Sequence, residues 1–109
     1  MPTDEDRIAT GRLLLGAEVR ARRKKAGLQL AELAALAEIS QTYLSDIERG
    51  NKMPPLPTLD TLATGLNTTV AELLNDIYPW GIRTAPDQLP ATLPDGRAGR
   101  SIRRSSGEA

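Results

Sequence analysis

The stretch AELAALAEISQTYLSDIERG, residues 31–50, decides how this chain folds. It predicts two short helices, residues 31–37 and 41–48, joined by the tight turn Glu38-Ile39. Ser40 precedes the second helix, where its hydroxyl can accept a hydrogen bond from an otherwise unpaired backbone N–H. Gly50 follows that helix and suits the left-handed conformation in which helices commonly end. The stretch therefore predicts two helices with a capped, tight connection.

The two faces of the second predicted helix differ in chemistry. Leu44 and Ile47 lie three residues apart on one face, so we expect both to be buried. The other face carries short hydrogen-bonding side chains, which suit contacts with base edges better than they suit a core: Gln41, Thr42, Ser45 and Asp46.

Composition limits the class of protein. A chain of 109 residues holds one small domain with tails. The sequence has no Phe, His or Cys, so its core must be aliphatic, and this favours packed helices. Without Cys there is no disulfide framework and no thiolate metal site. The sequence has neither an apolar run of about 20 residues nor the apolar segment of a signal peptide. We therefore expect a cytoplasmic protein.

The residues offer no catalytic constellation. The sequence has no His, no Cys and no Gly-rich phosphate loop. Asp46 and Glu48 are two apart on a predicted helix and point to different faces. We therefore predict no enzyme activity, no cofactor and no metal site, and the sequence identifies no small-molecule ligand.

Formal charge is zero, but its distribution is uneven. Residues 20–25 contain five basic side chains, whereas residues 4–6 are acidic. The basic cluster has two interpretations, a surface that meets phosphates or a solvated helix face.

The rest of the chain predicts three further helices. Residues 12–26 form the first, with Leu15 and Val19 facing inward and Arg22 lying along the core edge with its guanidinium in water. Residues 56–66 form the fourth, and a Thr69-x-x-Glu72 capping box begins the fifth, residues 70–77. We predict a flexible leader over residues 1–10, an all-α domain over 11–77 and an irregular, largely disordered tail over 78–109.

Residues 15–74 resemble the DNA-binding domain of the Xre family, the Cro/C1-type helix-turn-helix of phage and bacterial repressors. The resemblance runs without gaps and is carried by AGL at 26–28, LA at 33–34, YLSDIERG at 43–50, TLDTLA at 58–63 and VAELL at 70–74. It implies a five-helix lambda-repressor-like fold with disordered termini, and double-stranded DNA as the partner.

The resemblance also implies roles for individual residues. The second helix of the opening stretch would be the recognition helix, lying in the major groove and contacting bases through Gln41, Thr42, Ser45 and Asp46. Arg23 and Glu48 would form an ion pair that serves structure. Phosphate contacts would come from Gln29, Tyr43, Arg49, Lys52, Arg20 and Lys24.

This chain departs from the family pattern at three positions. Leu30 stands where a phosphate-gripping Gln is common, Glu38 stands where the turn usually has Gly, and Pro55 stands where a Ser would cap the fourth helix.

The resemblance leaves the biological role open. We expect a homodimer that represses a promoter from an inverted repeat. The alternative function is that of an antitoxin, which binds its operator and a toxin protein. A simpler alternative is a helical bundle that binds only protein. The dimer surface would include the fourth and fifth helices with Tyr78 and Trp80, although the two rings could instead cover the end of the core.

Overall fold

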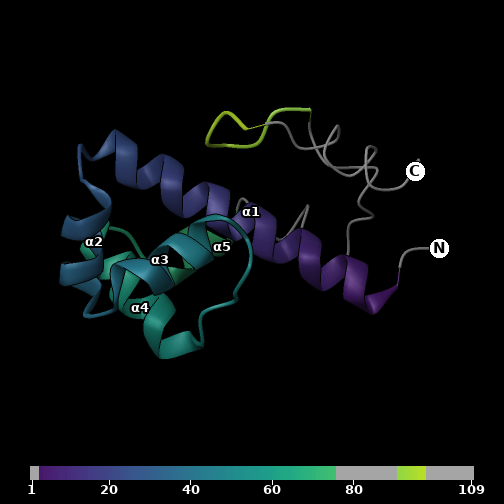
Figure 1. The fold of residues 1–109 in the computed structure, drawn as a ribbon, viewed down its shortest axis with the longest axis horizontal. Helices are drawn as coiled ribbons and strands as arrows, with labels where there is room; N and C mark the ends of the chain where they lie inside the picture. Colours follow the sequence, from purple (N-terminus) through teal and green to yellow (C-terminus); the bar gives the residue numbers. More distant parts are fainter. Residues whose placement is uncertain (1–2, 76–90, 98–109) are drawn as a thin grey trace.

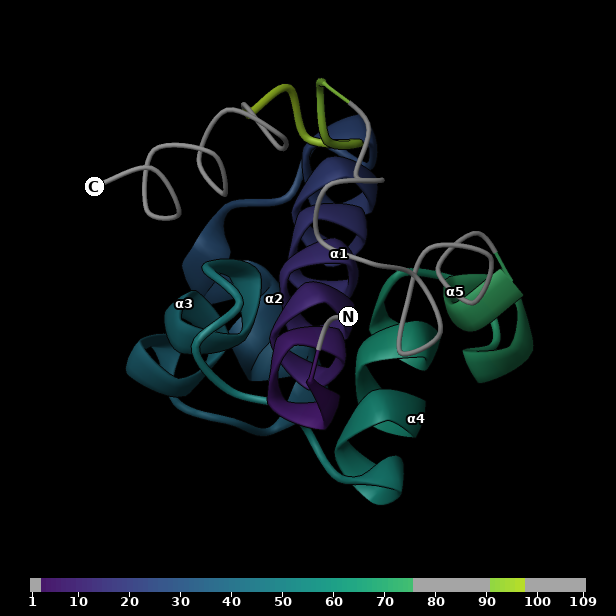
Figure 2. The same ribbon diagram turned by 90° about the vertical axis from the view of Figure 1, so that its right-hand side faces the viewer.

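The structure, a computed structural model, describes residues 3–75 and 91–97. Residues 3–75 form five helices in chain order: α1 (Asp4–Lys25), α2 (Leu30–Ala37), α3 (Gln41–Glu48), α4 (Leu56–Gly65) and α5 (Val70–Asn75) (Figure 1). Figure 2 shows α1 between α3 on one side and α4 with α5 on the other. The predicted all-α class with five helices is confirmed.

The first helix is longer than the sequence predicts. It begins at Asp4, so most of the flexible leader expected over residues 1–10 is helical. The Thr3 hydroxyl accepts from the Asp6 N–H at 3.1 Å, and the Asp6 carboxylate accepts from the Thr3 N–H at 3.2 Å. This capping box, with acidic residues at the positive end of the helix dipole, accounts for the extra turns. Apolar periodicity could not reveal them.

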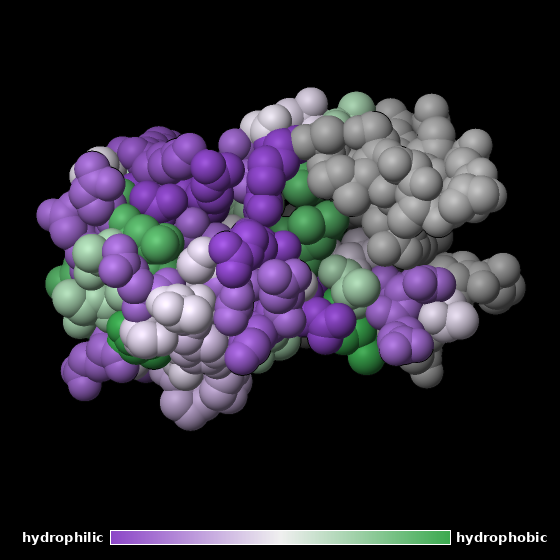
Figure 3. Space-filling view, in the orientation of Figure 1, coloured by the Kyte–Doolittle hydropathy of each residue, from purple (hydrophilic) through white to green (hydrophobic). Residues whose placement is uncertain are grey.

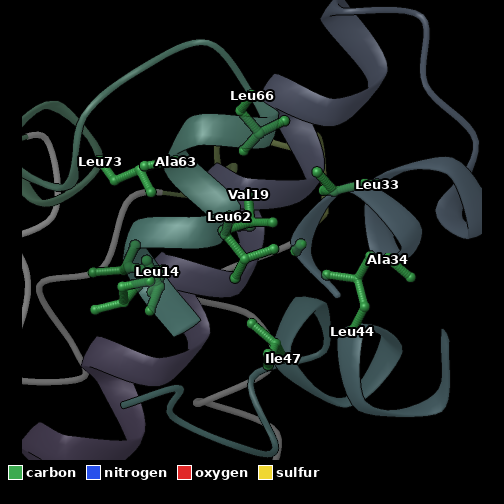
Figure 4. Close-up of a cluster of buried hydrophobic side chains, with 14 of the residues drawn as sticks. Leu14, Val19, Leu33, Ala34, Leu44, Ile47, Leu62, Ala63, Leu66 and Leu73 are labelled. Carbon is green, nitrogen blue, oxygen red and sulfur yellow. The ribbon is translucent and has the colours of Figure 1, made fainter. Parts of the chain in front are cut away.

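The core is aliphatic, as predicted, and is built by all five helices (Figure 4). Leu15 and Val19 of α1 are almost completely buried, whereas Ala26, expected to continue their stripe, is exposed. The buried hydrophobic residues are Leu14, Leu15, Ala17, Val19, Leu33, Ala34, Ala37, Leu44, Ile47, Leu59, Leu62, Ala63, Leu66, Leu73 and Leu93.

The turn between α2 and α3 contains a left-handed residue at the position where the family usually has Gly. Glu38 adopts a left-handed conformation, with φ 58° and ψ 41°. The Ile39 N–H donates to the Ala34 carbonyl at 3.0 Å, which closes the end of α2. Gly50, after α3, has a φ of 80°, as expected of a residue that ends a helix.

Arg22 is not simply solvated at the core edge. Its Nε donates to Glu18 Oε2 at 2.6 Å, and its Nη1 donates to the Thr68 hydroxyl at 3.3 Å. Glu18 is only 8% exposed, so this ion pair within α1 is partly buried, and the hydrogen bond to Thr68 joins α1 to the α4–α5 connection.

Residues 91–97, which we call the C-terminal turn, pack against the helical domain. The Leu93 N–H donates to the Arg97 carbonyl at 2.8 Å, and the Leu93 side chain is buried in the core. Within the tail expected to be largely disordered, this segment has a defined structure, because Leu93 and the charged groups of Asp95 and Arg97 find partners on the domain. Tyr78 and Trp80 lie outside the described residues.

Candidate nucleic-acid interface

The third helix is fixed at its start and along its inner face. The Ser40 hydroxyl accepts from the Tyr43 N–H at 3.0 Å and so caps α3. Leu44 and Ile47, on the inner face of α3, are completely buried. Gln41 and Thr42 are exposed in the first turn, and the surface in Figure 3 is largely hydrophilic with small hydrophobic patches. The helix therefore presents polar side chains from a rigid position.

Close helix packing holds the other end of α3. A Cβ placed on Gly16 of α1 would lie 2.3 Å from the Ile47 carbonyl oxygen and 2.6 Å from that of Glu48. Only a residue without a Cβ permits this crossing. The backbone of α1 therefore sets the depth of α3 in the domain.

Arg23 and Glu48 form an ion pair between α1 and the last residue of α3. Arg23 Nε donates to Glu48 Oε2 at 2.7 Å, and Nη2 donates to Oε1 at 3.1 Å. The remaining Nη1 donates to the Leu28 carbonyl at 2.9 Å. Both side chains are almost buried, at 11% and 6% exposure. The pair therefore fixes helix position and leaves little guanidinium surface for DNA.

The two other residues of the polar face are bound by Arg49. Its Nη1 donates to the Ser45 hydroxyl at 2.8 Å, and its Nη2 donates to Asp46 Oδ1 at 2.7 Å. Lys52 Nζ lies 4.0 Å from Asp46 Oδ2. The Asp46 charge is therefore offset by two cations, which reduces its repulsion of nearby phosphates.

The other side chains expected to meet phosphate surround α3 at different degrees of exposure. Gln29 and Lys24 are exposed, and the Gln29 N–H donates to Glu32 Oε1 at 2.7 Å at the start of α2. Lys52 is 58% exposed, with its Nζ 6.0 Å from the centroid of the half-buried Tyr43 ring. Arg20 donates to Asp95 of the C-terminal turn at 3.4 Å. Their contacts with phosphate stay predictions.

A surface hollow of about 420 Å³ lies beside α3. Four arginines contribute to its wall, and we call it the arginine hollow. Its lining residues are Arg20, Arg23, Leu30, Ser45, Glu48, Arg49 and Arg97. It joins the polar face of α3 to the first residue of α2 and to the C-terminal turn. A concave surface of this chemistry suits an anion.

Comparison with known proteins places the domain. Residues 14–75 match the family model described as a helix-turn-helix domain, which is more than half of the chain. This chain belongs to the Cro/C1-type helix-turn-helix family. In this family's terms α2 and α3 are the motif, and α3 is its second helix.

Relatives within the helix-turn-helix family agree in sequence and in fold. The transcriptional regulator DdrOP3 of Deinococcus deserti is 42% identical over 76 residues, which cover 70% of this chain and 55% of that protein. The chain thus spans about half of that relative's length.

Two solved structures support the fold. The clp gene regulator ClgR from Corynebacterium glutamicum matches with a TM-score of 0.60 and 35% identity, over 63% of this chain and 88% of that one. The DNA-binding domain of the phage P22 c2 repressor matches with a TM-score of 0.55 and 28% identity, over 75% and 93%. The lambda-repressor-like fold is confirmed.

Sequence reasoning did not place Arg97 in this helix-turn-helix site. The residue lies far along the chain from α3, in a segment without helical or strand periodicity. The position of Arg97 is set by contacts of its segment with α1 and α3, which no local sequence pattern predicts.

In the described ranges 3–75 and 91–97, no helix is long and apolar enough to cross a membrane, and no group of three or more His, Cys, Asp or Glu residues is arranged to hold a metal ion.

Proposed function

We propose that this chain is a transcriptional repressor that binds double-stranded DNA sequence-specifically, as a cytoplasmic homodimer on an inverted repeat. The observation that carries the proposal is the exposure of Gln41 and Thr42 in the first turn of α3, on a helix whose opposite face is locked in the core. In a helix-turn-helix domain this end of the second helix enters the major groove.

The chemistry of these side chains suits base recognition. The Gln41 amide has a donor and an acceptor that match N7 and the N6 amino group of adenine. The Thr42 side chain can bond a base edge or contact a thymine methyl group. Ser45 and Asp46 join the contact surface when Arg49 turns from them to a phosphate. Asp46 would then accept from the N4 amino group of cytosine.

Phosphate contacts position the domain on the duplex. Arg49 and Lys52 are more than half exposed at the end of α3, so both reach a backbone phosphate at little cost in burial. Lys24, Gln29, Tyr43 and Arg20 supply further contacts along the start of α2 and the end of α1. These contacts bring affinity and salt dependence, but they carry no sequence information.

We expect a dimer because the DNA-contacting surface of one domain is small. One α3 contacts only a few base pairs, and two-fold symmetry doubles that number. The two recognition helices would lie about 34 Å apart, one turn of DNA, on a palindromic operator. Repression then results from occupation of a promoter. The sequence has no His and no Cys, which supports a binding function without catalysis or cofactor.

Selection of bound sequences from random duplex DNA tests the proposal. We expect enrichment of a palindrome whose half-sites are about 10 base pairs apart, centre to centre. Recovery of unenriched sequence, at salt concentrations that permit binding, would refute a sequence-specific regulator. A second protein that stays bound through purification from the native cell would instead favour the antitoxin role.

A further inference from the structure

The C-terminal turn is anchored to α1 by a buried carboxylate. The Asp95 side chain has no exposed surface, and Arg20 Nη1 donates to its Oδ2 at 3.4 Å. Arg97 contributes a second cation through Nε, and its backbone N–H donates to Asp95 Oδ1 at 3.0 Å. A buried charge with these partners, together with the buried Leu93, fixes the turn in one place.

Arg97 also reaches the end of the recognition helix. Its Nη2 donates to the Glu48 carbonyl oxygen at 2.7 Å. The last carbonyls of a helix lack intrahelical partners and form the negative end of its dipole, so a guanidinium is favourable there. The Arg97 side chain therefore has a defined direction, along the wall of the arginine hollow.

The hollow lies on the side of α3 that the proposed function turns toward DNA. Ser45 and Arg49 of the polar face form one wall, and Leu30, the first residue of α2, lies beside them. The four guanidiniums of the hollow are opposed by three carboxylates, those of Glu48, Asp95 and Asp46, so one positive charge remains.

The C-terminal turn could either contact DNA or cover the DNA-binding surface of α3, and two features favour a contact with DNA. Gln41 and Thr42 remain exposed, so the C-terminal turn does not block base recognition. Of the Arg97 guanidinium nitrogens, Nη2 contacts the Glu48 carbonyl and Nε contacts Asp95, while Nη1 has no hydrogen-bond partner in the described part of the chain. The side chain is 28% exposed. The partly exposed side chain thus keeps one donor without an acceptor among the described residues.

We propose that the C-terminal turn is part of the DNA-binding surface, and that Arg97 binds a backbone phosphate beside the recognition helix. The phosphate would lie in the arginine hollow between Arg97 and Arg49. The inference rests on the proposed function and extends it to a segment outside the helix-turn-helix domain, since residues 91–97 lie beyond the residues that match the family model.

The test is a salt titration of DNA binding by the full chain, with the selected operator duplex as probe. Wild type, Arg97→Gln and Arg97→Lys are compared with Arg7→Gln, which removes the same charge near the start of α1, at the other end of the long axis from α3 (Figure 1). We expect Arg97→Gln to weaken binding about tenfold. It should also reduce the slope of log Kd against log salt by about 0.9. Arg97→Lys should keep the slope, and Arg7→Gln should match wild type.

Three results would overturn the inference. If Arg97→Gln matches Arg7→Gln, the residue makes no contact with DNA. If Arg97→Gln loses affinity with an unchanged slope, the residue acts only by positioning α3. Absence of salt-dependent binding by wild type would overturn the proposed function as well. This result therefore distinguishes failure of the proposed DNA-binding function from failure of the Arg97 contact alone. Thermal melting checks the fold of each variant, and Arg97→Met, which keeps the apolar stem, takes the place of Arg97→Gln if that variant unfolds.

Discussion

Arg23 and Glu48 are 25 residues apart in sequence and are joined by two hydrogen bonds, at 2.7 and 3.1 Å. The pair connects α1 to the last residue of α3. Since α3 carries the residues proposed to contact bases, the orientation of its polar face depends on an ion pair that itself contacts no base.

Removal of one partner of this pair should strongly destabilise the domain. We expect Arg23→Ala to lower the free energy of unfolding by about 3 kcal/mol, because Glu48 is left charged and almost buried. Urea unfolding measures the change. The double variant Arg23→Met/Glu48→Leu should lose less than Arg23→Ala alone, because no unpaired charge remains. A single-variant loss below about 1 kcal/mol would place the pair with ordinary exposed ion pairs.

The crossing of α1 and α3 should not tolerate a methyl group at Gly16. In Gly16→Ala the new Cβ would meet backbone oxygen at 2.3 Å, so the helices must separate, and we expect a loss of about 2–3 kcal/mol. Gly65→Ala in α4 is the matched control, since its Cβ would meet the Leu33 side chain at 3.1 Å and helix propensity favours Ala. Thermal melting of both variants gives the comparison. Equal melting temperatures would show that the α1–α3 packing is looser than described.

The turn of the motif should gain stability from glycine. Glu38 has a φ of 58°, which costs a residue with a Cβ about 1 kcal/mol relative to Gly. Glu38→Gly should therefore raise the free energy of unfolding by about that amount, despite the greater freedom of Gly in the unfolded chain. Glu38→Ala, with the same loss of charge, should show no such gain. Chemical denaturation of both variants separates backbone strain from charge, and a gain in Glu38→Ala would assign the effect to charge.

Asp46 should restrain the cations beside it. Its carboxylate accepts from Arg49 at 2.7 Å and faces Lys52 at 4.0 Å. Asp46→Asn removes the charge and keeps the shape, so both cations become freer to meet phosphates. We expect tighter binding to non-operator DNA and a steeper salt dependence, by up to one unit of slope. Fluorescence anisotropy with a duplex lacking the selected operator measures both. Weaker binding to this duplex would mean that the carboxylate itself is needed.

Much of the fold was predictable because it is locally encoded. Apolar spacing predicts α2 to α5, and Ser40 and Gly50 mark the ends of α3 through capping chemistry. The start of α1 was missed, because a capping box and acidic residues extend a helix that has no apolar stripe there. Sequence reasoning also put Arg22 in water, whereas Glu18 and Thr68 bind it.

The candidate site was only partly predictable, for a different physical reason. The exposed residues of α3 follow from helical periodicity, so Gln41 and Thr42 could be chosen from spacing alone. The network of Arg49 with Ser45 and Asp46 depends on side-chain conformation, which spacing does not determine. The contact of Arg97 with the Glu48 carbonyl joins residues 49 apart, and only the tertiary fold brings them together.

The central claim is that α3 reads base sequence through its first turn. The most direct measurement compares wild type and Gln41→Ala on the selected operator and on duplexes with each base pair of a half-site changed in turn. We predict that Gln41→Ala loses about 1–3 kcal/mol of binding free energy on the operator and becomes indifferent to one base pair in each half-site, with the other preferences kept. An equal loss on every duplex, or no loss on any, would contradict the claim that Gln41 reads a base.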